Sequence, residues 1–421
     1  MRIPRIYAER RERAIRAVSR SLLTLALPLV ILTGMYMMIV FGGSPAIAYW
    51  RGIWIETAMT TDNHQWLATS FFPKSVIDEV LSGRTHTGEI LGGAEFINLT
   101  PPEKPESKPA PETTIVRPPI PNKPSSYVAQ PVTELPAADI TPVTAIPQTE
   151  PEETAPFAGL DSNFGSLPGD ILGQANLSVG DSDYAGNTIA VNDMEQGIVI
   201  SEAAREGFKG KIMLIDDPSR VFVGSTIYND QGTRIPELLE AHNAIAGINA
   251  SGFFDPQGKG DGSGAVGIMM SEGQMTGDLV ETYGSIALTL EDKLVVGSNT
   301  IWNSMAVRDG IQFGPVLIAD GEKTVSGSAG YGIQPRTAIG QRADGVIVMA
   351  VIDGRSIRYS IGCMVGSLAE LMEEYGCINA ACCDGGSSSV MAYNGEVVNR
   401  NCSDNPTLGR RLPNAFLVRA K

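Results

Sequence analysis

The chain has 421 residues, of which 43% are hydrophobic and 19% charged, so a sizeable core can form and wholesale disorder is excluded. Its formal net charge is −15, although the first twenty residues carry seven Arg against two Glu. An acidic body gains nothing from counterion release, and no Lys/Arg run follows the N-terminus. A nucleic-acid partner is therefore excluded.

The N-terminal segment has the pattern of a membrane anchor. No charged residue occurs from Ser21 to Trp50, and the apolar stretch Leu22–Phe41 is about 30 Å long as a helix. The preceding arginines favour a basic cytoplasmic tail over 1–20, a transmembrane anchor over 21–42 and an extracytoplasmic remainder in a single-pass cell-membrane protein. The alternative is a signal peptide cleaved near Ala46-Ile47-Ala48, which also exports the rest.

Two further segments separate this anchor from the folded part. Residues 43–100 form a juxtamembrane segment with a short helix expected over Lys74–Leu81. Residues 101–156 hold 15 prolines among Glu, Lys, Thr and Ser, which is typical of an extended, solvated linker. A lead-in segment over 157–189 follows, and the remaining domain covers 190–421.

From about Gly186 the sequence alternates between short β-like runs and turns rich in Gly, Asp and Asn. The runs are Lys211–Ile215, Arg220–Val223, Ser285–Leu290, Lys293–Val296, Gly345–Ile352 and Ala415–Val418. One helix is expected over Ile235–His242. A second begins at Ser367, where Glu370 completes a capping box, and ends at Gly376. This pattern predicts an α+β domain of mixed β-sheets with a few flanking helices.

All five cysteines, Cys363, Cys377, Cys382, Cys383 and Cys402, fall in the last sixty residues. In an oxidising compartment they allow at most two disulfides and leave one thiol over. No CxxC pair occurs and His242 is the only His beyond His86, so the sequence predicts no metal site of zinc type. No cofactor is expected, and a divalent cation is left open.

The most informative motif is a buried strand over Ile378–Cys383 followed by Asp384-Gly385-Gly386-Ser387-Ser388-Ser389. Paired glycines permit a positive φ and close approach of a ligand, so successive amides can form an anion nest beside the Asp384 carboxylate. A carboxylate next to donors that bind an anion is suited to the cleavage of a charged ester. The alternative is an ordinary β-turn, because Asp-Gly and Gly-Gly are common hairpin signals.

Two other segments carry candidate binding groups. In Gly247–Asp255, the Asn249 side chain is a donor for a sugar hydroxyl or phosphate, and Phe253 or Phe254 offers a stacking face, although a Phe-Phe pair taken alone is more often part of a core. Arg336 begins a segment that leads to Asp353-Gly354-Arg355, and a guanidinium binds phosphate at two points. Arg410 and Arg411 are possible helpers, although a lone Arg is commonly a surface charge.

Several well-known chemistries are absent. The chain has no G-x-S-x-G elbow, no G-x-x-x-x-G-K-[ST] loop and no H-E-x-x-H motif, and the domain over 190–421 has one His. Carboxylates must therefore carry any proton transfer.

Taken in order, these segments resemble the phosphodiester glycosidase family over roughly residues 190–421. The matching motifs are Asn249–Asp255, Phe313-Gly314-Pro315, Pro335-Arg336-Thr337-Ala338-Ile339-Gly340, Asp353-Gly354-Arg355, the helix from Ser367, Asp384-Gly385-Gly386-Ser387-Ser388 and Arg411-Leu412-Pro413-Asn414-Ala415. The chain departs from the family at Ala250-Ser251, where many relatives have Gly-Gly, and in its doubled Cys before Asp384. These departures put substrate choice in doubt more than activity.

The resemblance implies hydrolysis of the bond between the anomeric carbon of a sugar and a phosphodiester, in envelope or exopolysaccharide material. Asp384 or Asp353 is then the base or nucleophile, and Arg336, with Arg411 and the three amides of Gly385 to Ser387, meets the phosphate. The expected substrate-binding residues are Asn249, Phe254, Thr337, Gly385, Gly386, Ser387, Ser388 and Arg411. The alternative is a module that binds a sugar phosphate or cell-wall polymer without turning it over. Both hypotheses require these distant segments to meet in one cleft.

Overall fold

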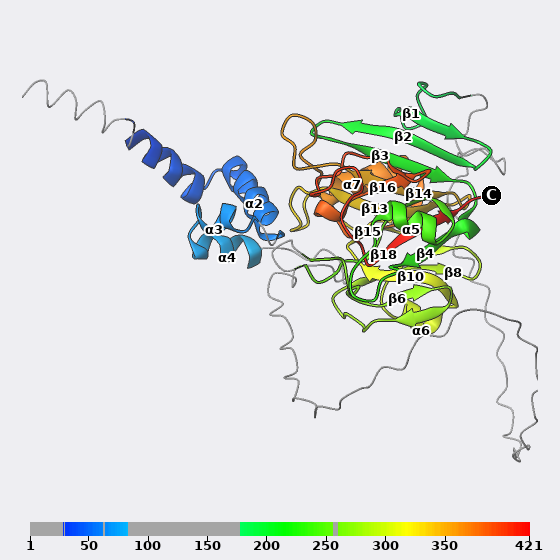
Figure 1. Cartoon of the computed structure of the whole chain (residues 1–421). Helices are drawn as coiled ribbons and strands as arrows, with labels where there is room; N and C mark the ends of the chain where they lie inside the picture. Colours follow the sequence, from blue (N-terminus) through cyan, green and yellow to red (C-terminus); the bar gives the residue numbers. More distant parts are fainter. Residues whose placement is uncertain (1–27, 29, 62–63, 83–176, 256–259) are drawn as a thin grey trace, which may run out of the picture. The chain divides into compact units, whose positions relative to one another are not determined.

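The computed structural model describes residues 28, 30–61, 64–82, 177–255 and 260–421 (Figure 1). They belong to one compact unit made of residues 1–99 and 163–421. The expected basic tail over 1–20 and the proline-rich linker over 101–156 lie outside the described residues, as does much of the lead-in segment.

The N-terminal part is helical. A helix over Val30–Phe41 is followed by α2 (Pro45–Met59), α3 (Trp66–Thr69) and α4 (Lys74–Ser82), and α4 confirms the helix expected over Lys74–Leu81. In the described ranges, no single helix is long and apolar enough to cross a membrane. Val30–Phe41 and Pro45–Met59 meet that requirement only as a pair bent by 82°. The transmembrane anchor expected over 21–42 lies partly outside the described residues and stays a prediction.

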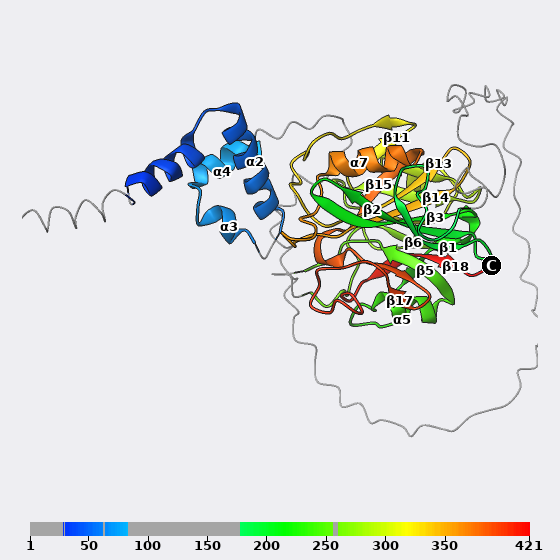
Figure 2. The same cartoon turned by 90° about the horizontal axis from the view of Figure 1, so that it is seen from above.

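The rest of the described chain forms three β-sheets and a few helices, which confirms the α+β class. The largest sheet has the order β1 (Thr188–Asp193), β2 (Ile198–Arg205), β3 (Phe208–Ile215), β14 (Ile347–Ile352), β13 (Arg336–Arg342), β15 (Cys377–Cys383), β11 (Val316–Ala319), β12 (Glu322–Lys323). Neighbouring strands in it pair antiparallel. Helix α7 (Val365–Glu374) packs against β11, β13 and β15 (Figure 2).

Two five-stranded sheets complete the domain. One has the order β7 (Gln274–Thr276), β6 (Met269–Ser271), β10 (Val307–Phe313), β8 (Gly284–Thr289), β9 (Leu294–Gly297), with α6 (Ile301–Ser304) beside it. The other has the order β17 (Glu396–Val397), β16 (Met391–Tyr393), β5 (Ala244–Asn249), β18 (Asn414–Arg419), β4 (Val221–Ser225), with α5 (Ile235–Ala241) against it. Figure 1 shows β1–β3 and β6, β8 and β10 on opposite sides of the domain.

The central strand β14 explains why the layers hold together. Its six residues, IVMAVI, are all buried, as expected for a strand covered on both faces. Val348, Ala350 and Ile352 enter the core that contains α7, whereas Ile347, Met349 and Val351 enter the core shared with β5 and β18. Side chains along a strand alternate between its faces, so one apolar run supplies two cores. Full burial of one such aliphatic side chain contributes about 1.5–3 kcal/mol to the free energy of folding.

The start of α7 corrects one sequence expectation. The helix begins at Val365 with Met364 as its N-cap, and no side chain caps it, so the capping box of Ser367 and Glu370 is wrong. Ser367 lies inside the first turn, where its hydroxyl is not at the capping position. The predicted C-terminal stop is confirmed, because Gly376 follows the helix with a φ of +77°.

Antiparallel pairing brings three predicted site residues together at the ends of neighbouring strands in the large sheet. Strand β13 lies between β14 and β15, with Arg336 opposite Ile352 and Thr337 opposite Cys383. Asp353 and Asp384 directly follow β14 and β15, and Arg336 is the first residue of β13. All three therefore lie at the same end of these neighbouring strands. The topology thus places these segments near one another.

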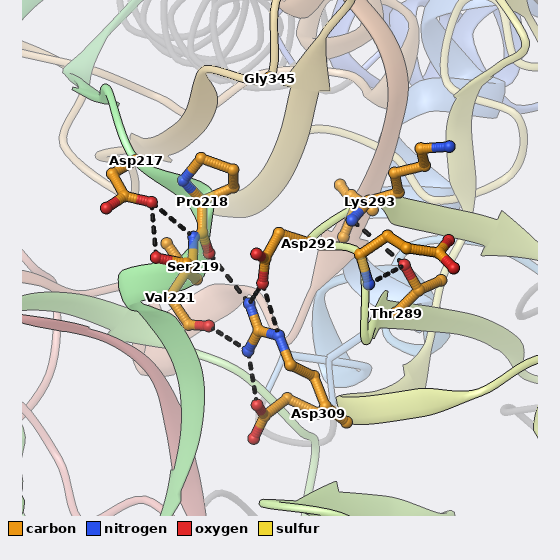
Figure 3. Close-up of polar contacts among 12 residues, drawn as sticks. Asp217, Pro218, Ser219, Val221, Thr289, Asp292, Lys293, Asp309 and Gly345 are labelled. Carbon is orange, nitrogen blue, oxygen red and sulfur yellow. Dashed lines mark hydrogen bonds and ion pairs between the residues drawn. The ribbon is translucent and has the colours of Figure 1, made fainter.

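An arginine inside the domain links the two smaller sheets. Arg308 in β10 donates to Asp309 Oδ2 at 2.7 Å and to Asp292 Oδ1 at 2.9 Å. It also donates to the carbonyls of Val221 at 2.6 Å and Pro218 at 2.9 Å, at the start of β4 (Figure 3). Burial raises the pKa of Asp309, and Arg308 opposes that rise. The pair compensates a carboxylate that would otherwise be buried alone.

Candidate active site

A cleft of about 320 Å³ opens at the sheet edge where β13 begins and β15 ends. Its wall is formed by loops that are distant in sequence. The lining residues of the β-sheet domain are Gly252, Phe253, Asp255, Tyr283, Phe313, Gly314, Tyr331, Gln334, Arg336, Arg355, Cys382, Cys383, Asp384, Gly385, Gly386, Ser387, Ser388 and Arg410.

Hydrogen bonds around the end of β15 fix the main chain of Asp384. Its amide donates to the Ala250 carbonyl at 2.9 Å, and its carbonyl accepts from Asn249 Nδ2 at 2.7 Å. Asn249 Oδ1 in turn accepts from Thr337 Oγ1 at 2.8 Å and from the Val390 amide at 3.0 Å. Asn249 is fully buried and does not line the cleft. Its hydrogen bonds therefore fix the position of Asp384 from inside the core.

The Asp384 carboxyl has an altered proton affinity. Burial raises its pKa to about 6, although a hydrogen bond from Ser388 and the positive charge of Arg410 act against that rise. The nearby Asp255 carboxylate adds to it by like-charge repulsion. A carboxyl with a pKa near 6 can exchange protons at neutral pH, which suits general acid or base chemistry.

Arg410 is the cation nearest to this carboxyl pair. Its Nη1 donates to Asp255 Oδ2 at 2.6 Å and to Ser387 Oγ at 3.0 Å, while Nη2 donates to the Gly260 carbonyl at 3.1 Å. The guanidinium carbon lies 4.6 Å from the centre of the Phe253 ring. These contacts use three of the five N–H groups of an arginine, which leaves two for a ligand.

Aromatic rings form the opposite part of the wall. Tyr283 and Phe313 meet edge to face with ring centres 5.6 Å apart, and Phe253 lies beside Arg410. A Cβ atom on Gly252 would lie 2.8 Å from the Phe313 ring, so glycine is required for that ring position. Burial raises the pKa of Tyr283, and the Asp384 charge raises it further. The ring faces are suitable for packing against a sugar.

The N-terminal helices also reach this cleft. Met59, Thr60, Thr61, His64 and Gln65 contribute to its lining. Thr57 near the end of α2 accepts from the Ile333 amide at 2.9 Å through its Oγ1 and from Gln334 Nε2 at 2.8 Å through its carbonyl. The segment after α2 therefore forms part of the rim.

Arg336 lines the cleft, but its donors are directed at the protein itself. Its Nη2 donates to the carbonyls of Tyr331 at 2.8 Å and Gly332 at 2.9 Å, and Nε donates to the Cys363 carbonyl at 3.4 Å. These bonds hold the 331–334 loop against β13. Two further arginines line the same cleft: Arg410, which the sequence analysis named as a possible helper, and Arg355, which it named only as part of a motif.

Asp353 lies outside the cleft lining. It is 2% exposed, and its carboxylate accepts from Asn399 Nδ2 at 2.8 Å and from the Tyr359 hydroxyl at 3.1 Å. Burial raises its pKa, and these two hydrogen bonds oppose the rise. The second carboxyl group that lines the cleft with Asp384 is instead that of Asp255, which the sequence analysis named only as the end of the Asn249–Asp255 motif.

The remaining expected binding residues are divided. Gly385, Gly386, Ser387 and Ser388 line the cleft, whereas Thr337 is fully buried behind it. The Phe254 ring is 61% exposed and does not line the cleft; the neighbouring Phe253 does. Arg411 lines an adjacent cavity.

The expected anion nest is mostly occupied by internal contacts. The Gly386 amide donates to the Pro335 carbonyl at 2.9 Å, and the Gly385 amide donates to the Asp384 carboxylate. Two of the three amides predicted to meet a phosphate are therefore already engaged. The guanidinium groups of Arg355 and Arg410 are therefore the main donors in this cleft that an anion could use.

The cysteines form no disulfide. All five are free, and Cys363, Cys377, Cys382 and Cys383 are buried. The structure thus contains neither of the two disulfides that the sequence allows at most. Over the described ranges, no group of three or more His, Cys, Asp or Glu is arranged to hold a metal ion.

Comparison with known proteins supports the family resemblance. The family model described as phosphodiester glycosidase matches residues 242–419, which confirms the resemblance predicted from the motifs. A curated relative, the SPbeta prophage-derived uncharacterized protein YomE of Bacillus subtilis (strain 168), is 28% identical over 205 residues. That alignment covers 45% of this chain and 29% of the relative, so the chain spans less than a third of that protein's length.

Solved structures give weaker likenesses. The zebrafish N-acetylglucosamine-1-phosphodiester alpha-N-acetylglucosaminidase catalytic domain, auto-inhibited by its pro-peptide, has a TM-score of 0.44 at 16% identity, covering 53% of this chain and 82% of that one. A hypothetical protein from Synechocystis has a TM-score of 0.37 at 15% identity, covering 53% and 62%. A putative exported protein from Burkholderia pseudomallei K96243 has a TM-score of 0.36 at 15% identity, covering 50% and 74%. At these scores the structural likenesses carry no argument.

The raised pKa of Asp384 predicts how this residue affects stability. Its folded pKa of about 6 lies above the ordinary carboxyl value of about 4, so the folded protein loses stability as the pH rises from about 4 through 6. Asp384→Asn removes that ionisation. We expect the variant to have a higher unfolding temperature than wild type at pH 8 and a similar one at pH 4.

Scanning calorimetry at both pH values measures this difference. Glu396→Gln, at an exposed carboxylate, is the control and should leave both temperatures unchanged. An Asp384→Asn variant less stable than wild type at pH 8 would show that Asp384 stabilises the fold as an ion.

Proposed function

We propose that the protein hydrolyses the bond between the anomeric carbon of a sugar and a phosphodiester, because residues 242–419 match the phosphodiester glycosidase family model. The observation that carries the proposal is the Asp384 carboxyl, with its pKa raised to about 6, next to the Arg410–Asp255 ion pair in one cleft. We propose envelope or exopolysaccharide material as the source of the substrate.

The leaving group needs stabilisation of charge more than a proton. Cleavage breaks the bond from the anomeric carbon to oxygen, and the electron pair stays on the phosphate. A phosphate monoester has a second pKa of about 6, so it departs without a strong acid. Arg355 and Arg410 both line the cleft and are placed to neutralise the developing charge.

Asp384 acts in its ionised form at the sugar carbon. The three aromatic rings Phe253, Tyr283 and Phe313 line the same cleft and offer faces for the sugar. Water supplies the hydroxyl that replaces the phosphate at the anomeric carbon, and its proton is taken up by the carboxylate or by solvent. Asn249 keeps the Asp384 main chain in register through its 2.7 Å hydrogen bond. It is a positioning residue because it does not line the cleft.

An assay of sugar release tests this proposal. Purified full-length protein is incubated with N-acetylglucosamine 1-(methyl phosphate) and with UDP-N-acetylglucosamine, and free sugar is measured. We expect release by wild type and a loss of at least about 10³-fold in Asp384→Asn, because the acting carboxylate is gone. Phe254→Ala, at an exposed ring outside the cleft, is the control and should keep activity within about twofold.

The outcomes separate the alternatives. Tight binding of the sugar phosphate without turnover in wild type would instead support a binding module. Undiminished release by Asp384→Asn would overturn the assignment of the site. The configuration of the released sugar then defines the role of Asp384, since inversion indicates a base that activates water and retention indicates a nucleophile.

We also propose that the N-terminal segment attaches the chain to a membrane with the β-sheet domain on the outer side. The support is the uncharged stretch Ser21–Trp50 after seven arginines. Protease added to intact cells should degrade the domain and leave a small fragment in the membrane pellet. Protection of the domain, or recovery of the whole chain in the soluble fraction, would contradict this attachment.

A further inference from the structure

A second cavity of about 610 Å³ adjoins the cleft, and none of the functions considered above uses it. It shares Arg355, Ser387 and Arg410 with the cleft. Its other lining residues are Arg234, Gly260, Asp261, Cys402, Ser403, Asp404 and Arg411. We call this space the basic cavity, because four arginines line it against two aspartates.

Three of these arginines are not neutralised by close carboxylates. Within the described part of the chain, no ion pair within 4 Å joins Arg234, Arg355 or Arg411 to an acidic side chain. Arg234 and Arg411 are anchored through main-chain carbonyls instead: Arg234 Nη1 donates to Gly409, and Arg411 Nη1 donates to Gly232 at 3.0 Å. Bonds of this kind hold a guanidinium in place without pairing its charge at close range, although Arg411 and the Asp261 carboxylate attract each other over a longer distance.

Arg355 lies at the junction of the two spaces. Its own φ is +57°, a left-handed conformation that is uncommon for a residue with a side chain. A Cβ on Gly386 would lie 3.1 Å from Arg355 Nη2, so the guanidinium packs on the glycine main chain beside Asp384. An uncommon backbone conformation thus accompanies a cation that faces both the cleft and the basic cavity.

We propose that the basic cavity binds a second phosphate of the substrate, carried by the aglycone. This inference rests on the proposed function and names its substrate class: a compound or polymer with repeated phosphate groups, rather than an isolated sugar phosphodiester. The cleft receives the sugar and the scissile phosphate, which Arg355 and Arg410 meet. The aglycone continues past Arg355, and its next phosphate is held by Arg234 and Arg411.

The physical basis is the fit of arginine to phosphate. A guanidinium presents planar paired donors that match phosphate oxygens and keeps its charge at any ordinary pH. Two such side chains fixed by carbonyl contacts lose little freedom on binding, which favours affinity. The acidic body of the protein repels a polyanion, so recognition depends on a local group of arginines such as this one.

The first test measures binding independently of catalysis. Isothermal titration calorimetry with inorganic tripolyphosphate compares full-length wild type with the double variant Arg234→Gln/Arg411→Gln. We expect the double variant to weaken binding by at least about tenfold, since two charge-assisted hydrogen-bonding groups are lost. Arg205→Gln, which removes one arginine charge outside both spaces, should leave the affinity unchanged.

The second test uses catalysis. The KM is compared for N-acetylglucosamine 1-(glyceryl phosphate) and for the same compound with a second phosphate on the glycerol. We expect the double Gln variant to raise KM about tenfold for the second compound only, with kcat unchanged. Arg234→Lys/Arg411→Lys keeps both charges and should retain most of the affinity, which separates lost charge from a damaged fold.

Each result bears on one of the two proposals. Hydrolysis of both compounds with equal KM, unaffected by the Gln variant, would overturn the second-phosphate site and leave the proposed function standing. Absence of hydrolysis, together with tripolyphosphate binding that the Gln variant loses, would overturn the proposed function and keep the basic cavity as an anion site. Tripolyphosphate binding that is equally strong in the Gln variant would overturn the inference directly.

Discussion

The site depends on one electrostatic arrangement, in which a single guanidinium lies near two carboxyl groups in a cleft closed by aromatic rings. Arg410 forms a 2.6 Å ion pair with Asp255, and its charge lowers the pKa that burial gives to Asp384. Without this cation, two carboxylates would face each other in a poorly solvated space, and one would hold its proton. The balance keeps Asp384 able to ionise near neutral pH.

The fold provides this arrangement through strand ends rather than through a single loop. Antiparallel pairing places the end of β15 beside the start of β13, and the buried Asn249 at the end of β5 binds the Asp384 main chain. Two sheets therefore contribute to the position of one carboxylate. A raised pKa in the folded state opposes stability, so the surrounding cores must hold Asp384 where it favours activity over stability.

The helices and strands could be predicted from the sequence better than the directions in which their side chains point. The buried strand before Asp384-Gly385-Gly386 and the family motifs were identifiable because apolar runs and glycines have local signatures. The roles of Arg336 and Asp353 were not, because tertiary contacts decide them: one binds three carbonyls, and the other binds Asn399 and Tyr359. Asp255 was assigned no role of its own, because only the fold brings it to Arg410.

The most direct measurement of this account is the pH dependence of kcat/KM in wild type, Asp255→Asn and Arg410→Gln. The account predicts a fall in activity below about pH 6 in wild type, since Asp384 acts as an ion. Removing the Asp255 charge should move that fall to lower pH, and removing the Arg410 charge should move it to higher pH. An acidic limb that stays in place in both variants, or moves in the same direction in both, would contradict the account.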